Sequence, residues 1–177
     1  MRLPSSRIAA LLCLAVTACL VACGYHTPGH STALPQSIRT ITVPPFENRT
    51  HTYRLEQTLT SAVLRELVTR TKYKIEQSND ANADATLHGS VLSAIEAPLT
   101  YDAQTGRASS MEVTVTVSVK LVARDGHVLF ENPNYVFREQ YEVSREITSF
   151  FEEESPALVR LSGDFARTLV SNILEAY

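Results

Sequence analysis

The amino-acid sequence predicts an α+β fold, with two amphipathic helices packed on one face of a mostly antiparallel sheet of four strands or slightly more. Apolar residues recur every three or four positions in residues 53–71 and again toward the C-terminus. Residues 111–121 instead alternate strictly between apolar and polar side chains. In the expected order, β-α-β-β-β-β-α, strands and helices alternate only at the start, which argues against a parallel doubly wound sheet.

Residues 1–22 have the pattern of a bacterial lipoprotein signal peptide. Arg2 and Arg7, with no acidic residue nearby, precede an uncharged 15-residue run, residues 8–22. This run is shorter than the roughly 20 apolar residues that span a membrane. It ends in Leu20-Val21-Ala22-Cys23, which resembles the lipobox, whose cysteine is diacylated before cleavage. An ordinary secreted protein with an incidental cysteine is the alternative.

A second cysteine competes for the lipid. Val16-Thr17-Ala18-Cys19 also fits the pattern, but cleavage there would leave three more apolar residues on the mature chain, so Cys23 is preferred. Only Cys23 of the three cysteines then remains, and a lone thiol is unusual in an oxidising compartment. Acylation removes that thiol. We therefore expect diacylglycerol and an N-acyl chain such as palmitate at Cys23, no other cofactor and no metal.

The next residues define the anchor and its tether. Gly24 follows the cysteine in place of the aspartate of an inner-membrane retention signal, which favours the outer membrane, with the domain on the periplasmic side. Residues 23–37 are expected to form a lipidated flexible tether, and residues 38–177 a single domain. His26 and His30 have the spacing of metal ligands on a helix, but the proline and glycine between them disfavour a helix.

The first part of the domain alternates between strand and helix. Residues 38–46 predict a short strand that stops at Pro44-Pro45, because proline removes a donor from the ladder. Residues 53–71 predict an amphipathic helix of about five turns that faces a core. Residues 73–75 are expected to form a short strand and residues 78–84 a polar loop.

Three longer strands follow. Residues 85–98 alternate, and their apolar set is expected on the buried face: Ala85, Leu87, Gly89, Val91 and Ile95. Residues 111–121 alternate without a break, and residues 127–143 return as their antiparallel partner after a tight turn at Asp125-Gly126. Asn132-Pro133-Asn134 is expected to bulge or interrupt the returning strand.

The remaining segments complete the fold. Residues 99–110 are expected to form a loop that projects beyond the sheet. The C-terminal helical pattern leaves two starts open, at Pro156 and upstream near Ser149. Each helix has one apolar face, so together they can cover one face of the sheet. The other face meets water or a partner, and it carries Thr114, Thr116, Ser118 and Lys120.

Composition and motifs argue against catalysis and nucleic-acid binding. Removal of the two basic residues within residues 1–22 takes the net charge from −3 to −5, whereas nucleic-acid binders carry a basic excess. The sequence has no nucleophile elbow, zinc-protease motif or phosphate-binding glycine loop. His51, His88 and His127 are scattered, without acidic and serine partners at a recognisable spacing. We therefore expect a binding protein, not an enzyme.

A resemblance to a known family rests on two segments and the helix that begins near Leu55. These segments are Cys23-Gly24-Tyr25-His26 and Ile41-Thr42-Val43-Pro44-Pro45-Phe46-Glu47-Asn48-Arg49-Thr50. They resemble the LptE family of lipopolysaccharide-assembly lipoproteins. The resemblance extends over essentially the whole mature chain, including the order of its strands and its final helix.

This resemblance implies a two-helix, four-stranded domain anchored to the inner leaflet of the outer membrane. Such a domain is a plug inside the large β-barrel of LptD, where it assists assembly of the barrel and delivery of lipopolysaccharide to the outer leaflet. Some members bind lipopolysaccharide through basic residues in projecting loops. By position the candidates here are Arg107 and Arg145, since an arginine fork suits phosphate. Solvated loop arginines are the alternative interpretation.

A second group of lipoproteins shares part of the pattern. Pro-Phe-x-Asn after a first strand also resembles the lipoproteins that activate peptidoglycan synthases and those of curli secretion. The alternative function is therefore an anchored adaptor for a synthase or for a curli-type secretion system. The Cys-Gly-Tyr start and the uninterrupted strand of residues 113–121 favour the LptE family.

Overall fold

The structure, a computed structural model, describes residues 34–35, 37–77, 82–143 and 150–176, with the backbone alone for residues 150–155. These residues belong to one unit, Ser31–Tyr177. Within them lie two helices, α2 (Leu55–Arg70) and α3 (Phe150–Glu175). The strands are β1 (Thr40–Thr42), β2 (Glu47–Asn48), β3 (Lys74–Glu76), β4 (Ala85–Tyr101), β5 (Ala108–Ala123) and β6 (Val128–Glu142).

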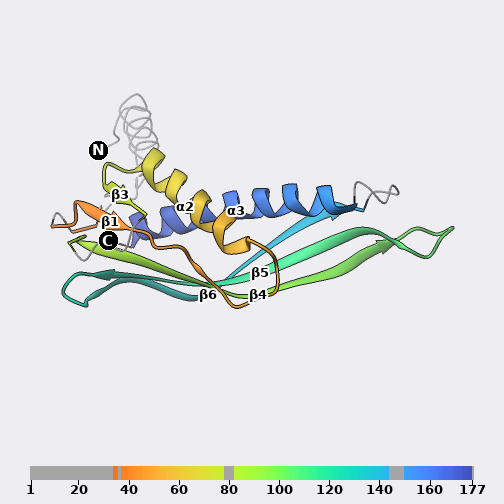
Figure 1. The fold of residues 1–177 in the computed structure, drawn as a ribbon, viewed down its shortest axis with the longest axis horizontal. Helices are drawn as coiled ribbons and strands as arrows, with labels where there is room; N and C mark the ends of the chain where they lie inside the picture. Colours follow the sequence, from red (N-terminus) through yellow and green to blue (C-terminus); the bar gives the residue numbers. More distant parts are fainter. Residues whose placement is uncertain (1–33, 36, 78–81, 144–149, 177) are drawn as a thin grey trace, which may run out of the picture. The chain divides into compact units, whose positions relative to one another are not determined.

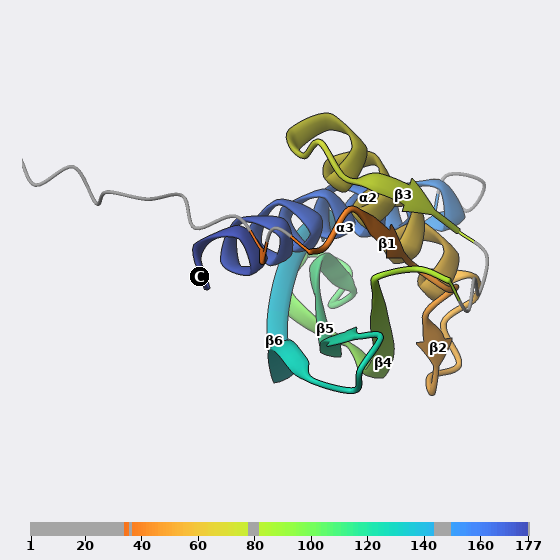
Figure 2. The same ribbon diagram turned by 90° about the vertical axis from the view of Figure 1, so that its left-hand side faces the viewer.

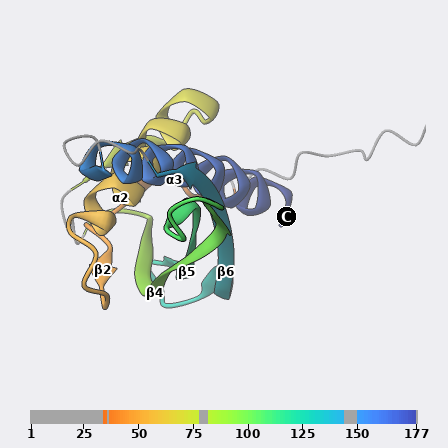
Figure 3. The ribbon, with the colours of Figure 1, turned by 90° about the vertical axis from the view of Figure 1, so that its right-hand side faces the viewer.

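The strands form one mixed sheet in the order β3-β1-β4-β5-β6. β2 pairs with β4 beside this path (Figure 3). β4, β5 and β6 are long and antiparallel, whereas β1 runs parallel to β3 and β4, and β2 runs parallel to β4. The parallel section follows from connectivity, because α2 lies between β1 and β3 and a crossover helix returns the chain to the same end of the sheet. The α+β class is confirmed, with a sheet of six strands.

Both helices cover the same face of the sheet, as predicted (Figures 1 and 2). On β5 the odd-numbered residues from Val113 to Leu121 are buried against them, and the even-numbered residues between are partly exposed. Helical spacing gives α2 and α3 one buried stripe each. The largest buried side chains of these stripes are Leu55, Leu59, Leu67, Leu161, Phe165, Leu169 and Ile173.

The expected loop over residues 99–110 is much shorter in the structure. β4 continues to Tyr101 and β5 begins at Ala108, which leaves only residues 102–107 as a turn. Hydroxyls fasten the strands near this turn: Thr100 Oγ1 lies 2.8 Å from the hydroxyl of Ser109 and 2.6 Å from that of Ser110. The prediction of a loop over all of residues 99–110 was wrong, because these hydrogen bonds between side chains favour strand pairing near the turn.

Ile95 is the second correction, because its side chain is 61% exposed and not on the buried face. Val91 pairs with Val117, but Ser93 pairs with Thr116, so Leu92 is an extra residue in β4. A bulge of this kind shifts the alternation of every later residue by one position. Ala94 therefore faces the core, and Ile95 faces away from the helices.

Two further expectations are confirmed. β6 bulges at residues 132–134, since Val117 pairs with Tyr135 while Val119 pairs with Asn132. Helix α3 starts at Phe150, near the upstream of the two predicted starts, and Pro156 lies inside it.

The ring of Phe46 packs face-on against Gly89 of β4 and ties the first loop to both layers. A Cβ atom at position 89 would lie 2.6 Å from carbons of this ring. The Phe46 N–H donates to the buried Thr60 hydroxyl of α2 at 3.0 Å, and the ring meets Phe165 of α3 edge-to-face at 6.3 Å. Gly89 is therefore required for close approach of ring to strand.

We expect Gly89→Ala to lower the free energy of unfolding by about 1–3 kcal/mol, because the added methyl group overpacks this contact. Chemical denaturation of the domain measures the loss. The Phe46→Leu background should reduce the cost of Gly89→Ala, since the smaller side chain leaves room. Equal costs in both backgrounds would show that the ring does not set the requirement.

Asp84 joins the start of β1 to Arg124, which directly follows the end of β5. Its carboxylate accepts the backbone N–H groups of Arg39 and Thr40, both at 3.0 Å, and its Oδ1 lies 3.2 Å from Nη2 of Arg124. The two backbone hydrogen bonds, and then the Arg124 guanidinium, hold the pKa of Asp84 below its ordinary value of 3.8. A lowered pKa means that the folded state favours the ionised form.

The contribution of Asp84 to stability is therefore present at neutral pH and is lost as the pH falls through its lowered pKa, below 3.8. We expect Asp84→Ala to be less stable than the parent chain at neutral pH, with a gap that narrows as the solution is acidified below that value. Denaturation curves across this range measure the gap. A gap that stays constant with pH would contradict the assigned role of the carboxylate.

Candidate functional site

The face of the sheet opposite the helices is uncovered by any described element (Figure 1). We call the part of it formed by residues 93–97 of β4, 112–116 of β5 and 136–140 of β6 the open sheet face. The register of β4, β5 and β6 arranges the side chains of the open sheet face in three rows across the strands. The rows are Ser93–Thr116–Val136, Ile95–Thr114–Arg138 and Ala97–Glu112–Gln140.

The open sheet face combines small polar residues with isolated apolar ones. Ile95 is 61% exposed and Val136 is 45% exposed, and both lie beside threonines of β5. Its opposite charges are close, since Arg138 Nε lies 3.8 Å from a Glu112 oxygen. A nearly neutral surface with partly exposed β-branched side chains is suited to contact with protein and offers no concentrated charge to an anion.

The turn between β4 and β5 presents Arg107. The Asp102 N–H donates to the Arg107 carbonyl at 2.8 Å, and the Asp102 carboxylate accepts the N–H groups of Gln104 and Thr105. Gly106 takes a positive φ of 66°, which closes the turn at little steric cost. Arg107 is exposed, and its guanidinium has no hydrogen-bond or ion-pair partner among the described residues.

Apolar side chains lie near this free cation. Tyr101 is 63% exposed and Leu99 is 43% exposed, and both belong to the last three residues of β4, next to the turn. The tip of the hairpin is therefore amphiphilic, with a cation that can reach an anionic group and carbon surface that can lie against an apolar chain. The other predicted arginine, Arg145, and the lipidation candidates Cys19 and Cys23 lie outside the described residues.

The predicted histidines are not brought together. His51 lies in the loop before α2, His88 on β4 and His127 after the β5–β6 turn, and all are exposed. No group of three metal-ligating side chains exists in the part of the chain that the structure describes. Likewise, no described helix is long and apolar enough to cross a membrane.

Within the segment of residues 41–50, Asn48 has a structural role. Its amide NH₂ donates to the Thr52 carbonyl at 3.0 Å and to the Glu56 carboxylate at 2.8 Å. Its carbonyl oxygen accepts the N–H and the hydroxyl of Thr50, at 2.9 and 2.8 Å. Because both ends of the amide are satisfied by the chain itself, Asn48 fixes the turn from β2 into α2 and is not free for a ligand.

Glu47 has an equivalent role at the sheet. Its carboxylate contacts the Arg49 guanidinium at 2.9 Å and accepts the Ser90 hydroxyl of β4 at 2.9 Å. The bonds from Arg49 and Ser90 lower the pKa of Glu47, so the carboxylate remains ionised in the folded protein. The segment therefore fastens the first loop to β4.

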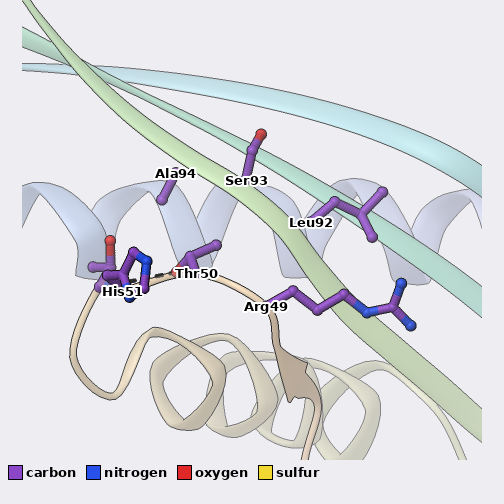
Figure 4. Close-up of a pocket in the computed structure, with 7 residues that line it drawn as sticks. Arg49, Thr50, His51, Leu92, Ser93 and Ala94 are labelled. Atoms are coloured by element: carbon purple, nitrogen blue, oxygen red, sulfur yellow. Dashed lines mark hydrogen bonds between the residues drawn. The ribbon is translucent and has the colours of Figure 1, made fainter.

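Sequence reasoning missed a hollow beside this loop. It measures about 390 Å³ and lies between loop residues 49–52 and residues 92–94 of β4 (Figure 4). Arg49, His51 and Leu92 are among the side chains that line it. The hollow depends on contacts between residues about 43 positions apart, for which local sequence periodicity carries no signal.

Solved structures similar to this chain share its fold. Lipoprotein B from Nitrosomonas europaea has a TM-score of 0.52 and 16% identity over 85% of this chain and 90% of that protein. A PelC dodecamer from Paraburkholderia phytofirmans has a TM-score of 0.53 and 17% identity over 78% and 90%. Protein XCC0632 from Xanthomonas campestris has a TM-score of 0.53 and 13% identity over 82% and 89%. No curated protein sequence matches the chain significantly.

A sequence model of a protein family gives a more specific identification than the similar folds do. The model of the LptE family, described as lipopolysaccharide-assembly, matches residues 38–173. This match runs from the residues just before β1 nearly to the end of α3, and so includes every described strand, all of α2, and α3 up to Ile173. The chain belongs to the LptE family of lipopolysaccharide-assembly proteins.

Proposed function

We propose that this protein is an outer-membrane lipoprotein, lipidated at Cys23, that plugs the LptD β-barrel from the periplasmic side. In this position it helps the barrel to assemble and assists transport and insertion of lipopolysaccharide. Its role is that of a non-catalytic adaptor, with no metal and no cofactor besides the covalent lipid. Family membership and the lipobox pattern support the proposal.

The open sheet face is the observation that carries the proposal. The lumen of a large membrane barrel is lined by polar side chains. Thr114 and Thr116, with small and apolar neighbours and internally paired charge, provide a complementary surface that loses little hydration energy when it is covered. A strongly charged face would resist such burial.

Purification of the lipidated protein from its own host's outer membranes in mild detergent tests this function. We expect a large β-barrel to co-purify in stoichiometric amount. Introduction of a charge on the open sheet face, by Thr116→Glu, should lower the amount of barrel recovered, because it buries a carboxylate whose cross-strand neighbours, Ser93 and Val136, are uncharged. Recovery of a peptidoglycan synthase, or only of copies of this chain, would instead support the alternative adaptor function.

We also propose that Arg107 contacts a phosphate group of lipopolysaccharide, with Arg145 as a second candidate. Arg107→Glu should weaken binding of purified lipopolysaccharide by about tenfold, since a charge-assisted hydrogen bond is replaced by repulsion. Arg65→Glu is the matched control, because Arg65 is an exposed arginine on α2 with no ion pair to another described residue. Equal effects of the two changes would reduce Arg107 to a solvated loop residue.

A further inference from the structure

One side of β4 is covered only along its first half. β1 pairs with Ala85 and Thr86, and β2 pairs with Ser90 and Val91. The Arg49 N–H then donates to the Val91 carbonyl at 3.0 Å, and the chain turns away into α2. From Ser93 onward β4 pairs with β5 on one side, and no described strand pairs with it on the other. We call residues 93–98 on this side the open β4 edge.

The direction of the backbone groups on this edge follows from the ladder. In an antiparallel pair, alternate residues direct both N–H and C=O away from the partner strand. The Val91 carbonyl faces β2, so Val91 is one of the outward residues, and the bulge at Leu92 resets the alternation. Ala94, Glu96 and Pro98 are therefore the next outward residues.

Pro98 is consistent with this assignment, because proline has no N–H and is tolerated where that group would point away from the ladder. The open β4 edge thus offers the N–H and C=O groups of Ala94 and Glu96, and the carbonyl of Pro98. These groups repeat at the spacing of a polypeptide strand, which neither an acyl chain nor a sugar matches. Pro98 marks the end of the segment that could pair.

The other edges of the sheet carry the features that discourage pairing. β3 is three residues long and has Lys74 and Glu76. β6 has a bulge that contains Pro133, and charged side chains from Glu131 to Glu142. Short length, bulges and charge are the usual protection of edge strands. The open β4 edge has the sequence Ser93-Ala94-Ile95-Glu96-Ala97-Pro98, with one charged residue. It contains the exposed Ile95 and follows directly on the exposed Leu92.

The hollow described above lies at the start of this edge, where β2 leaves β4 (Figure 4). A strand that continued along β4 from the end of β2 would lie beside residues 92–94, which line this hollow. The space is therefore continuous with a pairing that the fold already makes, and it leaves room for the first residue of a further strand.

We propose that the open β4 edge accepts an extended segment of the barrel partner as an additional strand, paired through Ala94 and Glu96. This inference rests on the proposed function for the identity of the partner. Strand addition supplies main-chain hydrogen bonds for affinity, and Leu92 and Ile95 supply apolar contact for specificity. Two-fold pairing with a second copy is disfavoured, because it would place two Glu96 carboxylates on neighbouring strands of one face.

Proline substitution tests the backbone contact, with a control at the same position. Glu96→Pro removes the outward N–H, while Glu96→Ala keeps it, and both lose the 3.1 Å hydrogen bond between Glu96 and the Tyr141 hydroxyl. Each variant of the full lipidated chain is co-expressed with its host's LptD-type barrel and purified. We expect Glu96→Pro to recover about tenfold less barrel than Glu96→Ala.

Hydrogen exchange on the unmodified chain gives an independent readout that does not depend on a variant folding. The outward amides of Ala94 and Glu96 should exchange at least about tenfold more slowly in the purified complex than in the free chain. Equal barrel recovery and unchanged exchange would overturn strand addition and leave the barrel partnership intact. Absence of any barrel from the unmodified preparation would overturn both proposals. Equally slow exchange in the chain purified without the barrel, through pairing between its own copies, would overturn strand addition from the barrel.

Discussion

The contact between the Phe46 ring and Gly89 is the constraint on which the arrangement of the fold depends. The ring lies on the backbone of β4 while the Phe46 N–H binds Thr60 of α2 and the ring edge meets Phe165 of α3. One residue of the first loop therefore fixes the positions of both helices relative to the sheet. Glu47 and Asn48, which follow directly, then have a defined place on β4 and at the start of α2. Within the segment of residues 41–50 that carries the family resemblance, Glu47 and Asn48 therefore serve to attach the first loop to β4 and to α2.

The bulge at Leu92 divides β4 into two parts with different roles. Before it, Leu87 and Val91 face the core and the outer side of the strand is covered by β1 and β2. After it, the alternation is reversed, Ile95 faces the open sheet face, and the outer side has no described partner. A single extra residue thus converts a core strand into one that presents both a face and an edge.

Most of the fold could be predicted from local periodicity, because α2 and β5 have unbroken patterns of 3.6 and 2 residues. The parallel pairing of β1 with β3 and β4 has no local signal, since it depends on where a crossover helix returns the chain. The position of Ile95 could not be predicted because Leu92 is apolar and does not mark a bulge. Of the candidate site, Arg107 could be proposed from its position in a loop, and its role stays a prediction. The open β4 edge could not be predicted, because it depends on where β1 and β2 stop along β4.

The turn that carries Arg107 has a consequence for the entropy of recognition. Asp102 holds residues 102–107 through the Arg107 carbonyl and the backbone N–H groups of Gln104, Thr105 and Gly106. The hydroxyls of Thr100, Ser109 and Ser110 join the strands just behind this turn. The backbone that positions the guanidinium is thus already ordered before any ligand arrives. In the proposed contact with phosphate, binding would restrict only the side-chain rotamers of Arg107, so a cation on this preorganised turn would contribute more affinity than the same residue on a flexible loop.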